Sequence, residues 1–261
     1  MSTILSHLEG GVLTLTLNRP EALNALNLAM IADLKAATAK AELDDGVRVV
    51  VIQGGEHFMA GGDLKWFHSQ LVLPPEERQP LFEQTIAAVH ATTLQLRRMG
   101  KPVVAAVSGA AAGFGLSLML ACDLAVAADS AYFTLAYCHI ALSPDGGATW
   151  FLPRAVGAKR AAEIALLGDR FDARQALEWG LLNRVVPAAE LAAESQKLAR
   201  RLAAGPREAL ARTKALLQAA GSNSLPEQLF AEQANFAACA VNPDFAAGLG
   251  AFLEKRKPSF A

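Results

Sequence analysis

The sequence predicts an α/β protein with a mostly parallel sheet, and three observations support this fold class. The segments VRVVVIQGG (47–55) and KPVVAAV (101–107) are continuous apolar runs, as expected of strands that are covered on both faces. Helical segments alternate with these strands, which is typical of βα units. With 261 residues, of which 52% are hydrophobic and 19% charged, the chain is long enough to bury a large core.

The first third of the chain alternates between the two kinds of element. Two runs of period 2 flank Gly10 and Gly11 and predict a hairpin, and residues 28–45 have helical spacing. After the strand at 47–53, a glycine turn opens a short helix. Residues 71–84, LVLPPEERQPLFEQ, carry three prolines and a charge cluster, so they predict a surface loop, and a helix follows to about residue 98.

The second half is predicted to begin with a strand, a glycine turn, a helix and two further strands over residues 101–135. From Pro144 onward the pattern is almost purely helical, with two amphipathic helices separated at Gly205 and Pro206. We place a boundary near residue 200. Residues 1–200 are then the core domain, and residues 201–261 a helical C-terminal region whose apolar stripes need a partner surface.

Composition and spacing argue against several functional classes. A net charge of −1 provides no field that would recruit nucleic acid or an anionic membrane. The uncharged run 102–122 is interrupted by proline and glycine, and no signal segment is visible, so we expect no membrane span and a cytoplasmic protein. Three distant cysteines predict no disulfide framework, and the histidines lack metal-site spacing, so no metal is expected.

Two glycine turns, AGGDL (60–64) and AAGFGLS (111–117), each follow a strand and open a helix. Backbone N–H groups at a helix start have no partner within the helix and lie at the positive end of its dipole. Two such ends could converge on one oxygen. Alternatively, the glycines only permit tight turns and close packing. Neither turn matches the GxGxxG or Walker A pattern of nucleotide-binding loops.

Taken in order, several blocks of the sequence resemble the crotonase, or enoyl-CoA hydratase/isomerase, superfamily. They are NRPEALNAL, FMAGGDLK, KPVVAAVSGAAAGFGLSLMLACDLAVAADSAYF, PDGGATWFLPRAVG, ALEWGLLNRVV and FLEKRKPSF. The resemblance implies a spiral ββα core and a helical C-terminal region that forms a homotrimer, often a dimer of trimers. It also implies an acyl-CoA thioester substrate and no cofactor beyond the coenzyme A of that substrate.

The resemblance also assigns roles to residues of the two turns. The backbone N–H groups of Gly62 and Phe114 are expected to form the oxyanion hole for the thioester carbonyl, where donors aimed at a developing charge lower the barrier. Ala60, Gly62, Asp63 and Leu64 match the segment that contacts coenzyme A. For Asp63 we expect helix N-capping to be the main role.

The catalytic carboxylates set this chain apart from the family's hydratases. Hydratases use two glutamates, and the matching positions are Ser117 and Tyr137, so the two-glutamate hydration mechanism is not available. Asp145, in PDGGATWFLPR, falls where isomerases of phenylacetate degradation carry a single catalytic aspartate. One carboxylate is enough to move a proton between carbons. We therefore expect a 3-enoyl-CoA to 2-enoyl-CoA isomerase, although Asp145 alone could also be a helix N-cap.

Three further interpretations stay open at this point. A histidine and an aspartate at positions matching His90 and Asp145 act in the 4-chlorobenzoyl-CoA dehalogenases, so the chain could be a dehalogenase-like enzyme with His90 near the substrate. It could also perform enoyl-CoA hydratase-like chemistry, or serve as a non-catalytic acyl-CoA binding scaffold. Tyr137 is expected either to line the acyl pocket or to pack in the core.

Overall fold

The computed structural model describes residues 2–260 and has a six-stranded sheet at its centre. The first two strands form an antiparallel hairpin and every later pair is parallel, as the sequence predicts. In spatial order the strands are β1 (Ile4–Glu9), β2 (Val12–Leu17), β3 (Val49–Gln53), β4 (Val103–Val107), β6 (Leu124–Ala128) and β9 (Arg184–Val186). The central strands β3 and β4 are buried along almost their whole length, which explains their unbroken apolar sequence.

A second, three-stranded sheet lies beside the first. Its strands are β5 (Ala110–Ala112), β7 (Tyr132–Thr134) and β8 (Phe171–Asp172). β5 follows β4 after a turn at Ser108 and Gly109, so the chain leaves the large sheet and enters the small one immediately before the second glycine turn. This change of sheet brings the second turn next to the first.

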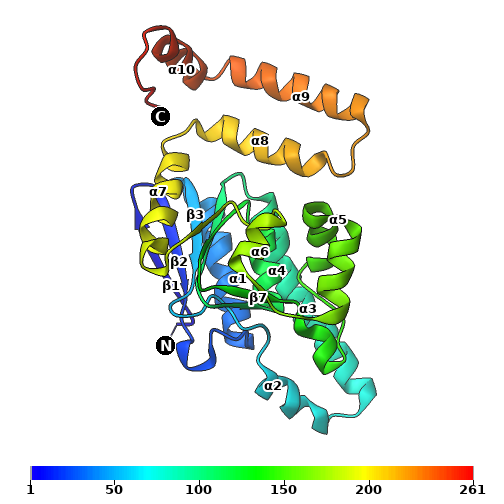
Figure 1. Ribbon diagram of the computed structural model, residues 1–261. Helices are drawn as coiled ribbons and strands as arrows, with labels where there is room; N and C mark the ends of the chain where they lie inside the picture. The colour runs from blue at the N-terminus through cyan, green and yellow to red at the C-terminus, as the bar shows by residue number, and fades with distance from the viewer. Residues whose placement is uncertain (1, 261) are drawn as a thin grey trace.

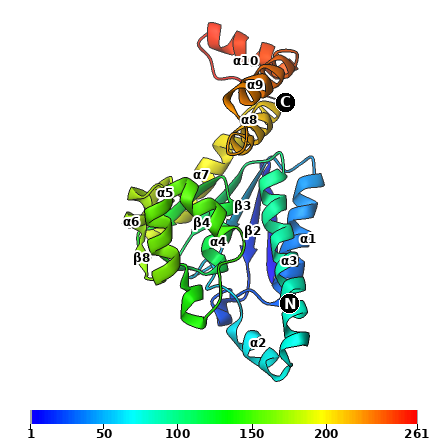
Figure 2. The same ribbon diagram turned by 90° about the vertical axis from the view of Figure 1, so that its right-hand side faces the viewer.

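The described residues form ten α-helices (Figures 1 and 2). They are α1 (Leu28–Leu43), α2 (Leu64–Ser69), α3 (Pro75–Arg98), α4 (Phe114–Ala121), α5 (Ala148–Leu167, interrupted at Gly157), α6 (Ala173–Glu178), α7 (Leu191–Ala203), α8 (Arg207–Ala219), α9 (Leu225–Ala240) and α10 (Pro243–Leu253). Figure 2 shows α1 and α3 on one side of the strands and α5 and α6 on the other. The predicted α/β fold class is therefore confirmed.

One prediction about local structure is wrong. The predicted loop at 71–84 is helical over most of its length, because α3 already begins at Pro75. Two of its three prolines, Pro74 and Pro75, stand at the N-cap and first helical position, where the missing N–H costs nothing. The region after Pro144 is almost purely helical, as predicted, and is interrupted by the short strands β8 and β9. These strands have two and three residues, too few to form a period-2 pattern.

The C-terminal helices α8 to α10 extend from one end of the body, whereas α2 lies at the opposite end (Figures 1 and 2). The break between α7 and α8 falls at Gly205 and Pro206, as predicted. α7 itself still packs on β3, β4 and β6 of the large sheet. Within residues 2–260 no single helix is long and apolar enough to cross a membrane. The helices α9 and α10, which meet at a bend of 79°, reach the required length and apolarity only as a pair.

Candidate active site

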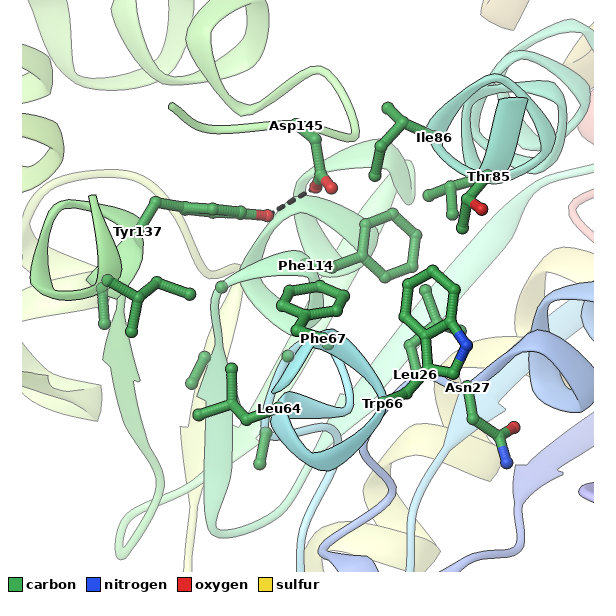
Figure 3. A pocket seen from close by; sticks show the side chains of 18 of the residues that line it. Leu26, Asn27, Leu64, Trp66, Phe67, Thr85, Ile86, Phe114, Tyr137 and Asp145 are labelled. Atoms are coloured by element: carbon green, nitrogen blue, oxygen red, sulfur yellow. Dashed lines mark hydrogen bonds between the residues drawn. The ribbon is translucent and has the colours of Figure 1, made fainter. Parts of the chain in front are cut away.

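A cavity of about 250 Å³ opens between α2, α3, the two glycine turns and the segment from Ala136 to Asp145. Its wall is mostly apolar, and Figure 3 shows aromatic rings crowding its centre. The lining residues that carry the argument below are Ala60, Gly62, Leu64, Phe114, Tyr137 and Asp145. The predicted site residues that line this space thus come from four separate parts of the chain.

The two glycine turns lie in direct contact. Met59 and Ala112 connect them, because the Ala112 N–H donates to the Met59 carbonyl at 2.9 Å. Beyond this bridge the backbones come so close that a Cβ on Gly61 would lie 3.2 Å from the Ala112 oxygen and 3.7 Å from the Gly113 Cα. Glycine at these turns allows an approach that a side chain would obstruct.

Each turn contributes to the cavity lining one residue whose backbone N–H has no acceptor among the described residues. Phe114 is the first residue of α4, so its N–H has no acceptor within the helix. Gly62 lies next to Asp63, the N-cap of α2. Among the described residues, neither N–H donates a hydrogen bond to the backbone or to a side chain. The turns therefore offer two unpaired donors on one cavity wall, an arrangement that can stabilise a negative charge on a ligand oxygen.

Asp145 lies in the loop before α5, and the backbone around it is fixed from two sides. The Ser117 hydroxyl of α4 donates to the Asp145 carbonyl at 2.9 Å. The Gly146 N–H donates to Nε2 of His90 on α3 at 3.2 Å. The N-cap of α5 is Gly147, without a side-chain cap, so helix capping does not account for Asp145.

The Asp145 side chain points into the cavity toward Tyr137 (Figure 3). The Tyr137 hydroxyl donates to Oδ1 of Asp145 at 2.5 Å. Burial raises the pKa of the Asp145 carboxyl, while the hydrogen bond from Tyr137 and the electrostatic influence of the nearby His90 lower it. A half-buried carboxyl with a raised pKa is suited to exchange protons with a substrate.

The remaining predicted site residues are spread around this centre. Ala60 and Leu64 line the cavity. Asp63 caps α2 through the N–H groups of Lys65 and Trp66, as expected, and its carboxylate also pairs with Arg19 at 3.1 Å. His90 is exposed and does not line the cavity, so its contact with the site runs through the Gly146 backbone.

Sequence reasoning missed several residues in and beside the cavity. Trp66 and Phe67 of α2 and Phe82 of α3 form a cluster with ring centroids 5.4–5.6 Å apart, and the Phe67 ring lies against Gly62. Because Phe82 falls in the proline-rich segment that suggests a loop, the sequence gives no sign of its pairing with α2. His139 also lines the cavity, with Nε2 3.2 Å from the Leu167 carbonyl.

No group of three or more His, Cys, Asp or Glu side chains is positioned to hold a metal ion within residues 2–260. The arrangement that remains is a mostly apolar cavity, two backbone donors and one carboxyl group. These features are those needed to stabilise an enolate oxygen and move a carbon-bound proton.

The model of the enoyl-CoA hydratase/isomerase family matches residues 7–261. The chain belongs to this family. It is 41% identical over 261 residues to a 1,2-epoxyphenylacetyl-CoA isomerase of Escherichia coli strain K12, covering 100% of this chain and 98% of the relative. It is 35% identical to a 4-chlorobenzoyl coenzyme A dehalogenase of Arthrobacter sp, over 96% of this chain and 90% of that protein.

Solved structures agree with the assignment. The crystal structure of an enoyl-CoA hydratase from Polaromonas sp. JS666 superposes with a TM-score of 0.94 at 39% identity, over 99% of both chains. The predicted crotonase-like fold and family resemblance are confirmed. An acyl-CoA thioester substrate fits this family.

Proposed function

We propose that this chain is an isomerase that shifts the double bond of a 3-enoyl-CoA to the 2 position. One observation carries the proposal: Asp145 is the single carboxylate among the described residues that line the cavity, and that cavity also contains both glycine turns. An isomerisation needs one group that removes and returns a proton, whereas addition of water generally needs a second group to activate the water.

In the proposed mechanism Asp145 takes a proton from carbon 2 of the acyl group. The electron pair of the broken C–H bond delocalises onto the thioester oxygen, where the N–H groups of Gly62 and Phe114 donate to the enolate. Asp145 then returns the proton to carbon 4, and the double bond forms between carbons 2 and 3. The mostly apolar lining limits water and strengthens these hydrogen bonds.

The residues at the two hydratase glutamate positions support isomerisation over hydration. The Ser117 side chain is fully buried, and its hydroxyl is engaged with the Asp145 carbonyl. Burial and then the nearby Asp145 charge raise the pKa of the Tyr137 phenol, so this group stays protonated at neutral pH. Neither side chain can replace a carboxylate as the base that activates water.

The test uses a panel of 3-enoyl-CoA esters and follows the ultraviolet absorbance of the conjugated 2-enoyl thioester. The wild type is expected to produce this absorbance, and Asp145→Asn, which keeps the shape of the side chain, is expected to lose at least about 10²-fold in kcat. Equal tightness of acyl-CoA binding in both proteins would show that the variant lost chemistry and kept the site. Full activity in Asp145→Asn would refute the mechanism.

A second candidate is isomerisation of a CoA ester that carries a ring-derived group. The relative at 41% identity is an epoxyphenylacetyl-CoA isomerase, and the cavity is lined by Trp66, Phe67 and Phe114. Aromatic side chains pack well against flat unsaturated rings. Higher kcat/KM for such an ester than for any linear 3-enoyl-CoA would favour this substrate class, with the same base and the same donors.

A dehalogenase and a non-catalytic scaffold would each give a different result with CoA esters. Halide release from 4-chlorobenzoyl-CoA would indicate dehalogenase chemistry, but the position of His90 outside the cavity, bonded to the Gly146 N–H, gives it no direct access to a bound ester. Tight binding of acyl-CoA without exchange of its carbon-bound protons into solvent would indicate a non-catalytic scaffold.

We also propose that residues 201–261 form the surface through which copies associate, as a homotrimer or a dimer of trimers. The helices α9 and α10 expose large apolar side chains, with Phe230 74%, Phe236 75% and Phe252 80% accessible. An exposed apolar surface of this kind is typical of a protein interface. These side chains also explain why the bent α9–α10 pair is apolar enough to resemble a membrane segment.

A further inference from the structure

Tyr137 occupies a special position beside the candidate base. It lies in the 3₁₀ helix Ala136–Ile140, and its ring is part of the cavity wall next to the second glycine turn, where a Cβ on Gly113 would be 3.8 Å from its Cζ. The hydroxyl reaches Oδ1 of Asp145 at 2.5 Å, and Figure 3 shows the two side chains pointing toward one another.

The two oxygens of Asp145 differ in their surroundings. Oδ1 accepts the Tyr137 hydroxyl, while no described residue donates a hydrogen bond to Oδ2. We infer that Tyr137 is a positioning residue, whose hydroxyl fixes the Asp145 carboxylate through Oδ1 and leaves Oδ2 to take and return the substrate proton. This inference rests on the proposed function, because it assumes that Asp145 is the base.

The same hydrogen bond favours the ionised form of the base. Burial raises the pKa of Asp145 and favours the neutral carboxylic acid, which cannot accept a proton, and a donor to the charged form opposes this effect. The groups that face Asp145 are Tyr137 from the 3₁₀ helix and His90 from α3, while α4 contributes the uncharged Ser117, whose hydroxyl donates to the Asp145 carbonyl. Tyr137 is thus the only described side chain that donates to the carboxylate.

The first test compares Tyr137→Phe with Tyr132→Phe. The chain has two tyrosines, and Tyr132 lies outside the cavity, in β7, under the Arg170 guanidinium at 4.6 Å. In Tyr137→Phe, loss of the donor raises the pKa of Asp145. The acidic limb of the kcat/KM profile should therefore move to higher pH. Tyr132→Phe should retain the wild-type profile.

The kinetic constants separate positioning from simple packing. Loss of alignment of the base is expected to lower kcat by about ten- to a hundredfold. KM should stay nearly constant, because the Tyr137 hydroxyl binds the carboxylate and not the substrate. A Tyr137→Phe enzyme with the wild-type pH profile and kcat would overturn the inference.

A second measurement needs no activity. In a Tyr132→Phe background Tyr137 is the only tyrosine, so tyrosinate absorbance on alkaline titration reports its phenol alone. Adding Asp145→Asn removes the neighbouring negative charge, so the tyrosinate absorbance should appear at lower pH than in Tyr132→Phe alone. An unchanged titration would show that the two groups do not interact in solution and would refute the inference.

Failure of the inference and failure of the proposed function give different results. If Asp145→Asn keeps full isomerase activity, Asp145 is not the base and the proposed function fails, whatever Tyr137 does. If Asp145→Asn is inactive while Tyr137→Phe behaves as the wild type, the function stands and only the positioning role is lost. Thermal unfolding of each variant checks that loss of activity does not reflect loss of folding.

Discussion

Gly146 determines how the Asp145 side chain enters the cavity. Its φ is +63°, a left-handed conformation that residues with a Cβ rarely adopt. A Cβ at this position would also lie 2.7 Å from the Phe114 ring and 2.7 Å from the Ser117 Cβ. The glycine after the aspartate therefore allows the loop to pass directly over α4, where Ser117 binds the Asp145 carbonyl.

At this residue scale we predict that Gly146→Ala destabilises the fold and removes isomerase activity. The left-handed backbone costs about 1–2 kcal/mol with a Cβ, and crowding against Phe114 and Ser117 adds about 1–3 kcal/mol. Chemical unfolding and the absorbance assay measure the two effects. Gly10→Ala is the matched control, because Gly10 also has a positive φ, +54°, but a Cβ there meets nothing within 4 Å.

In Gly10→Ala the unfolding free energy should fall only by the cost of the left-handed backbone. The variant should keep its activity, since Gly10 lies in the β1–β2 turn. Equal losses of unfolding free energy in both variants would contradict the crowding argument. Full activity in Gly146→Ala would show that the loop can shift without moving the carboxylate.

Between elements, one buried lysine attaches the C-terminal helices to the body. Lys214 of α8 is 8% exposed, and its ammonium donates to the carbonyls of Leu96 and Lys101 at 2.8 and 2.9 Å. It also pairs with Asp123 at 2.7 Å. Because Leu96 belongs to the last turn of α3, the lysine satisfies a carbonyl group that the helix end leaves unpaired.

We predict that Lys214→Met lowers the unfolding free energy by about 3–5 kcal/mol, because Asp123 and two carbonyls lose a buried partner. Denaturant unfolding measures the loss. Lys197→Met is the control, since Lys197 pairs with Glu194 on the surface with 70% of its side chain exposed. An exposed ion pair of this kind contributes at most about 1 kcal/mol to the unfolding free energy. A loss of the same small size in Lys214→Met would mean that α8 is held by other contacts.

For the whole molecule, the candidate site and the exposed apolar helices lie at different ends. α2, which lines the cavity, is at one end of the body, and α9 and α10 extend from the other (Figure 1). Association through the C-terminal helices would therefore cover apolar side chains without filling the cavity of the same chain.

The corresponding prediction is that the wild type has a mass of three or six times 27.5 kDa by light scattering after gel filtration. Phe236→Glu combined with Phe252→Glu should reduce this mass, because burying two unpaired charges at an interface is unfavourable. Leu43→Glu is the control, an equally exposed leucine at the end of α1, 83% accessible. A monomeric wild type would contradict the proposal directly.

Much of the fold is predictable because its signals are local. The buried strands at 49–53 and 103–107, the hairpin around Gly10 and the helix starts after both glycine turns are all expected from the sequence. The exceptions are β8 and β9, which are too short to carry a pattern, and α3, whose initial prolines suggest a loop. In both cases the tertiary contacts, and not the local pattern, decide the structure.

The sequence by itself determined the family, the α/β class and the choice of Asp145, since these depend on residue types in a fixed order. Only the tertiary structure brought Tyr137 to 2.5 Å from Oδ1 of Asp145 and put His90 outside the cavity. The physical reason is that hydrogen bonds and van der Waals contacts depend on distances of a few ångströms between distant elements. Such distances follow from packing of the whole chain, which no short segment encodes.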